Sequence, residues 1–138
     1  MVEHLTFALA MLGYLGLTIA AAMSGRTFRF SLWRCTVPII VLHVVLVWSV
    51  RYQWQWARAT RNGYAGFLIF HTALLMIVIS AFLNSRAAAK IVPIAYLVVT
   101  AGALGAVFRY DIVAVYRIPV ILCALSGAGV MLRHAVSR

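Results

Sequence analysis

Long apolar runs separated by short polar stretches divide the chain into five segments. The runs cover residues 5–23, 36–50, 64–83, 91–108 and 112–132. About 20 apolar helical residues cross the hydrocarbon layer of a bilayer, and about 17 can suffice. The pattern therefore predicts an all-α fold, a polytopic integral membrane helical bundle with five transmembrane helices. The bundle is expected to form a single domain over residues 1–138.

Two of the five runs are less regular than the others. The second is short, and its flanking residues Leu32, Trp33, Trp48 and Tyr52 are expected to lie at the headgroup level and complete the crossing. Arg117 and Pro119 interrupt the last run, which indicates an interfacial segment over residues 109–116 followed by a final helix with Pro119 in its first turn. The alternative is four transmembrane helices plus an interfacial helix.

Small residues are concentrated in the first, fourth and fifth runs. They include Gly13, Gly16, Gly102, Gly105 and Gly127. Small side chains let helix backbones approach closely inside a bilayer, where association depends on packing. We therefore expect these three helices to form the closely packed part of the bundle.

The composition excludes most enzyme classes. Hydrophobic residues make up 65% of the chain and charged residues 10%, whereas soluble domains contain about 25% charged residues. Glu3 and Asp111 are the only acids, against 12 Lys and Arg, and the net charge is +10. Two acids disfavour paired-carboxylate hydrolysis, an acidic metal cage and a Ser-His-Asp triad. The sequence contains no self-contained catalytic constellation, so we expect at most an electron-transfer subunit.

The basic residues give a weak indication of orientation. Lys and Arg lie near the ends of the runs, with seven on one side of the predicted bundle and five on the other. The first run lacks a basic residue before it, so we interpret it as a retained helix and not a secretory signal. Because no basic residue precedes this run, we place the N-terminus outside and the C-terminus in the cytoplasm. We expect the membrane to be a bacterial inner (plasma) membrane.

A group of aromatic and basic side chains surrounds the end of the second run. Such a mixture is typical of the membrane–water interface, where aromatic rings and basic anchors meet the headgroups. The alternative is a docking surface for a quinone ring, a lipid headgroup or a partner subunit, because Trp and Arg are also common in binding hot spots. The candidate contact residues are Trp48, Tyr52, Trp54, Trp56, Arg51 and Arg58.

Two histidines occur inside apolar runs, His43 in the second and His71 in the third. Ionisable groups at membrane depth are expensive and are functional candidates by default. The two residues fall at similar predicted depths on consecutive antiparallel helices, which is the arrangement that holds a b-type haem with one nitrogen on each face of the iron. A structural hydrogen bond, a proton relay and a quinone contact remain alternatives.

These observations favour a small subunit or anchor of a respiratory or photosynthetic electron-transfer complex, with a haem b or related porphyrin between His43 and His71. The expected partners are other membrane subunits, anionic lipids and a quinone, with no role in nucleic-acid binding. One alternative is a non-redox structural, assembly or lipid-binding subunit of a larger membrane complex. Another is a small-solute channel or carrier, which the lack of a buried carboxylate disfavours.

Overall fold

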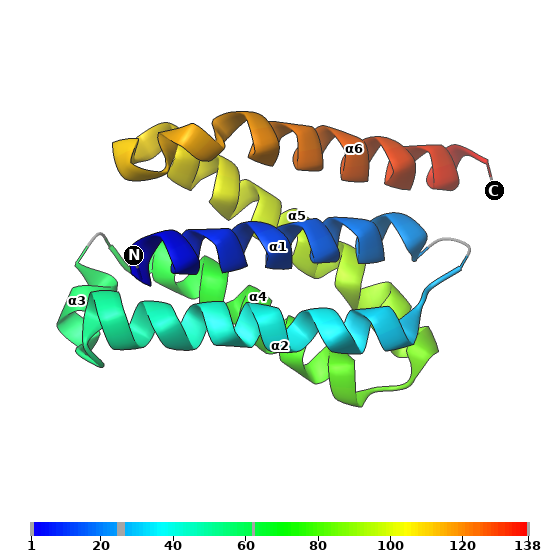
Figure 1. Ribbon diagram of the computed structural model, residues 1–138. Coiled ribbons are helices and arrows are strands. Elements are labelled where there is room, and N and C mark those ends of the chain that lie inside the picture. Colours follow the sequence, from blue (N-terminus) through cyan, green and yellow to red (C-terminus); the bar gives the residue numbers. More distant parts are fainter. Residues whose placement is uncertain (1, 25–26, 62, 138) are drawn as a thin grey trace.

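The computed structural model of the protein describes residues 2–24, 27–61 and 63–137. Within these ranges every regular element is a helix (Figure 1). Five helical segments are long and apolar enough to cross a membrane, which confirms the predicted all-α bundle with five spans. The elements are α1 (Val2–Met23), α2 (Phe30–Leu46), η1 (Val47–Tyr52), α3 (Trp56–Thr60), α4 (Tyr64–Phe82), α5 (Ser85–Arg109), η2 (Asp111–Tyr116) and α6 (Arg117–Val136).

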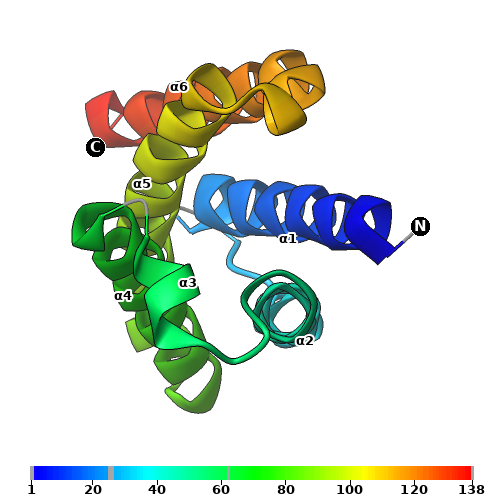
Figure 2. The ribbon, with the colours of Figure 1, turned by 90° about the vertical axis from the view of Figure 1, so that its left-hand side faces the viewer.

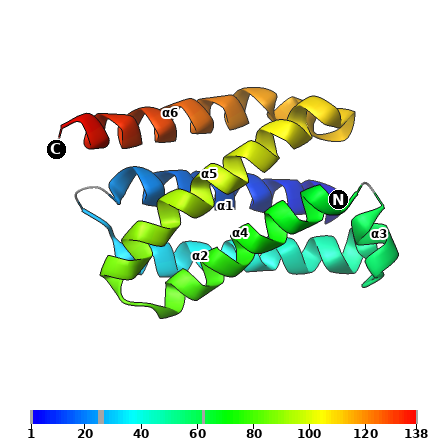
Figure 3. The same cartoon turned by 180° about the vertical axis from the view of Figure 1, so that it is seen from behind.

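The helices form two layers. In the first layer α6, α1 and α2 lie side by side, with α1 in the middle (Figure 1). The hairpin of α4 and α5 forms the second layer and crosses the first diagonally, as Figure 3 shows from behind. The end view in Figure 2 places α1 between α2 and α6 and beside α5. Helix α1 therefore contacts three other spanning helices and occupies the centre of the bundle.

The core gathers around α1 and the middle of α5. Leu17 of α1 and Tyr96 of α5 are almost completely buried, and the Tyr14 and Tyr96 rings stack with centroids 6.2 Å apart. The Tyr96 hydroxyl donates to the carbonyls of Cys123 and Ala124 of α6, at 3.0 and 2.9 Å. An unpaired polar group is costly where water is absent, so these bonds allow a tyrosine to join three helices at the core.

A second polar contact joins the two layers. The indole nitrogen of Trp33, which is fully buried on α2, donates to Ser80 Oγ of α4 at 3.0 Å. The prediction that Trp33 lies at the headgroup level is therefore wrong, because its ring packs between two helices. The Ser80 hydroxyl in turn donates to the Ile77 carbonyl at 2.7 Å. Among the described residues, no buried side-chain nitrogen or oxygen lacks a hydrogen-bond partner. The core therefore satisfies the requirement that polar groups in a membrane be paired internally.

The glycines of the predicted scaffold contact the second and third spans as well as one another's helices. A Cβ on Gly13 of α1 would lie 2.8 Å from Ile40 of α2, and one on Gly102 of α5 would lie 2.7 Å from the Phe70 ring of α4. A Cβ on Gly127 of α6 would meet Tyr96 of α5 and Thr18 of α1, so the first, fourth and fifth spans do pack closely, as expected. The glycines of α1 and Gly102 of α5 extend this close packing to α2 and α4. Gly105 has no neighbouring atom within 4 Å of such a Cβ and faces outward.

The helix bounds extend beyond several of the apolar runs. The second span continues from Phe30 through η1 to Tyr52, a length of 23 residues, so it is not short. The fourth begins at Ser85 because the Asn84 side chain caps it, accepting from the Ala87 amide at 2.9 Å. The last span contains the predicted interfacial segment as η2, a 3₁₀ helix that precedes α6, and Pro119 lies in the first turn of α6.

Candidate functional site

His43 projects from α2 toward α1. Its Nδ1 lies 2.8 Å from the carbonyl oxygen of Thr6, near the start of α1. A carbonyl is only an acceptor, so the imidazole donates through Nδ1–H and leaves Nε2 as its other nitrogen. The side chain is partly buried at this point. His43 therefore contributes a cross-link between the first two spans, and a metal could reach it only through Nε2.

His71 uses both of its ring nitrogens. Its Nδ1 lies 2.8 Å from the carbonyl of Phe67, one turn earlier on α4. The indole nitrogen of Trp48 donates to His71 Nε2 at 3.1 Å. Because an indole N–H is only a donor, Nε2 must accept, and the neutral Nδ1–H tautomer satisfies both contacts. This hydrogen bond joins η1 to α4.

The two histidines engage different neighbours. His71 is paired with Trp48, which lies five residues beyond His43, or about 7 Å farther along the helix axis. No hydrogen bond or ring contact joins the two imidazoles within the described structure. A bis-histidine haem needs a nitrogen from each residue on opposite faces of one iron. The pair does not fit that group as it stands, because Trp48 occupies Nε2 of His71.

Trp48 is the centre of an aromatic cluster that includes most of the predicted interfacial residues. Its ring lies 5.7 Å from Tyr52, 5.9 Å from Trp54 and 6.3 Å from Phe67, measured between centroids. Trp56 of α3 contacts the same Phe67 ring at 4.6 Å. Offset and edge-to-face aromatic pairs each contribute about 0.5–1.5 kcal/mol beyond buried area. The cluster therefore ties the segment between the second and third spans to α4.

The chain reverses after the second span through an unusual turn. Val47–Tyr52 is π-helical, and Gln53 and Trp54 follow with φ values of 50° and 58°. Positive φ is uncommon for residues other than glycine and costs free energy. The Trp54 amide donates to the Trp48 carbonyl at 3.0 Å, and the Arg58 guanidinium donates to Gln53 Oε1 at 2.6 Å. These contacts hold the turn in its strained form.

The structure gives three contact partners for the residues singled out from the sequence. Phe67 stacks on His71 with ring centroids 3.8 Å apart. Gln53 accepts a hydrogen bond from Arg58, and the Thr6 carbonyl accepts one from His43. Phe67 could have been found from its spacing of one turn before His71. The Thr6 contact depends on how two helices pack, and nothing in either run signals it.

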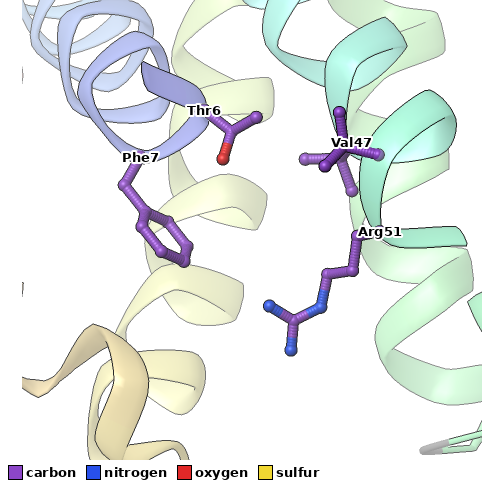
Figure 4. Close-up of a pocket in the computed structure, with 5 residues that line it drawn as sticks. Thr6, Phe7, Val47 and Arg51 are labelled. Atoms are coloured by element: carbon purple, nitrogen blue, oxygen red, sulfur yellow. The ribbon is translucent and has the colours of Figure 1, made fainter. Parts of the chain in front are cut away.

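Arg51 lies apart from the aromatic cluster, on the side of η1 that faces α1. It lines a crevice of about 20 Å³ together with Thr6, Phe7, Val47 and Val50. Figure 4 shows the guanidinium extending into the space between Phe7 and the turn of η1. A volume of this size holds about one water molecule. The crevice therefore has no room for a quinone or porphyrin ring.

A larger groove of about 310 Å³ follows the contact between α1 and α6. Its lining is apolar apart from one thiol, and neither histidine borders it. Among the described residues, no group of three or more His, Cys, Asp or Glu side chains could hold a metal ion. The lining residues are Met11, Leu12, Leu15, Pro119, Leu122 and Cys123.

The fold and these contacts define an integral membrane protein whose two intramembrane histidines cross-link its own helices. Comparison of the chain with protein-family models, with curated proteins and with solved structures found no match.

Proposed function

We propose that the protein is a non-redox structural or assembly subunit of a larger membrane complex. The observation that carries this proposal is the pairing of His71, whose two nitrogens are bonded to Trp48 and Phe67. A residue that ligates a haem must offer a free nitrogen to the iron. The same bond supports a role for His71 in fixing the turn of η1 against α4.

The small buried fraction of most spans supports association with other membrane proteins. In α1, 39% of the most apolar 18-residue stretch is buried inside the bundle. In each of the other four spans, this buried share is only 17% to 22%. Large apolar side chains remain exposed on several helices, including Phe82 at 82% and Val115 at 77%. Such faces must be covered by lipid or by neighbouring helices, and in lipid the latter associate through close packing.

The test uses the full-length protein, extracted from its native membrane in a mild detergent. We expect it to migrate in a native gel as part of an assembly larger than the isolated chain, and to show no Soret absorption in the oxidised or reduced state. The His43→Ala variant should still enter the assembly. His134→Ala is the matched control, because His134 lies near the end of α6, away from both cross-links.

Three results would overturn the proposal. Migration as an isolated chain would exclude a subunit role. A Soret band that disappears in His43→Ala or His71→Ala, but not in His134→Ala, would support the electron-transfer alternative with a haem between the two residues. Solute flux into liposomes that contain this protein alone would support the channel or carrier alternative.

A further inference from the structure

One end of the bundle carries cations from three helices. The end of α1, the start of α2, the turn from α4 to α5 and the end of α6 lie together there (Figures 1 and 3). All five described cations at this end are exposed. We define the basic end by these residues: Arg29, Arg34, Arg86, Lys90 and Arg133.

Both acids of the chain lie at the opposite end. Glu3 belongs to the first turn of α1, and Asp111 begins η2 after the end of α5. The sequence contains no other Asp or Glu. The basic end therefore has no acidic side chain of its own to neutralise its cations.

The cations of the basic end are largely unengaged by the protein. Arg34 lies over the Phe30 ring, 5.3 Å from its centroid. For the other four, the described part of the chain supplies no hydrogen-bond or ion-pair partner. At the opposite end, Arg117 donates to the Val107 carbonyl at 2.8 Å and Arg58 donates to Gln53. The donors of the basic end thus remain available for an external anion.

We propose that the basic end binds the headgroups of anionic phospholipids, and this inference is independent of the proposed structural role. Its cations lie within about a turn and a half of the helix ends, so their long side chains can reach the headgroup level. They are distributed over α2, α5 and α6 instead of gathering on a single helix face. This distribution suits many separate lipid phosphates better than one acidic protein segment.

The experiment compares two charge-matched double variants of the full chain. Arg86→Gln with Lys90→Gln removes two cations from the basic end, and Arg61→Gln with Arg109→Gln removes two exposed cations from the opposite end. Within the described ranges the Arg109 guanidinium contacts only the ring of the adjacent Tyr110, so the control variant leaves the turn after the second span unchanged. Each protein in detergent micelles is titrated with phosphatidylglycerol or phosphatidylcholine, and bound lipid is counted by native mass spectrometry.

The wild type should bind phosphatidylglycerol in preference to phosphatidylcholine, and added salt should weaken that preference. Each basic residue near a surface of anionic lipid strengthens binding about fivefold, so loss of the basic-end pair should weaken it by about 25-fold. The opposite-end pair should have a smaller effect. The helical circular dichroism spectrum of each variant in the same detergent micelles verifies that it is folded.

Three outcomes would overturn the proposal. Wild-type protein could bind the two lipids equally. The two double variants could lose phosphatidylglycerol to the same extent, which would assign binding to net charge and not to the basic end. A polyglutamate peptide could displace the lipid at low concentration from wild type but not from the basic-end variant, which would assign the surface to an acidic protein partner.

Discussion

Replacement of His71 by phenylalanine tests the central cross-link of the proposed function. The change retains an aromatic ring against Phe67, which now stacks on the imidazole with an interplanar angle of 19°. It removes the acceptor of the Trp48 indole N–H. The Trp48→Phe variant removes the donor instead, and the double variant replaces both partners with apolar rings.

The expected loss of stability in each variant depends on which polar group loses its hydrogen-bond partner. An indole N–H left unsatisfied in a partly buried position costs about 1–3 kcal/mol, whereas replacing both members of a pair by apolar groups can be nearly neutral. Hydrogen bonds between membrane helices couple their partners by about 0.6 kcal/mol on average, with larger values reaching about 1.7. We therefore expect each single variant to be destabilised, and the double variant to be less destabilised than the sum by about 1 kcal/mol.

The assay is equilibrium unfolding in mixed detergent micelles with increasing dodecyl sulfate, followed by far-ultraviolet circular dichroism. A double-mutant cycle gives the coupling free energy between the two side chains. Coupling below about 0.3 kcal/mol would mean that the hydrogen bond does not contribute, since independent sites add within that range. A haem absorption band that is present in the wild type and in Trp48→Phe, but absent in His71→Phe, would refute the structural role directly.

Two packing predictions use other contacts. Gly102→Ala should destabilise the protein by about 1–3 kcal/mol, because the added Cβ would lie 2.7 Å from the Phe70 ring. Gly105 faces open space, so Gly105→Ala should be neutral or stabilising. The same unfolding assay measures both variants. Equal effects of the two substitutions would argue against the close approach of α4 and α5. Ser80→Ala should cost about 1–3 kcal/mol by leaving the buried Trp33 indole unpaired, and an unchanged unfolding midpoint would show that this bond is dispensable.

Sequence reasoning predicted the fold better than its internal packing. Hydropathy located all five spans because a bilayer imposes the same length and apolarity on each helix, whatever its neighbours. Arg117 and Pro119 also indicated the break before the last helix, which the structure contains as η2. The partners of the glycines could not be derived, since a small residue permits close approach without specifying which helix arrives.

The histidines illustrate the same limit at the level of the site. Counting residues from the ends of each run gave approximate depths, but a depth does not specify a direction around the helix axis. His43 turns toward α1 and His71 toward η1, because the diagonal course of the α4–α5 hairpin brings α4 alongside the turn (Figure 3). That crossing angle depends on side-chain packing over the whole interface. The π-helix of η1 likewise has no signal in the apolar pattern.

The strained turn and the His71 bond are parts of one device for fixing the aromatic segment. Two consecutive residues with positive φ, Gln53 and Trp54, cost about 1–2 kcal/mol each. Contacts of the Trp48 ring with its aromatic neighbours, at about 0.5–1.5 kcal/mol each, can offset that cost only while the ring is held in place. The hydrogen bond from the Trp48 indole to His71 Nε2 of α4 holds the ring in that position. The partly buried histidine therefore determines the position of an exposed tryptophan surface.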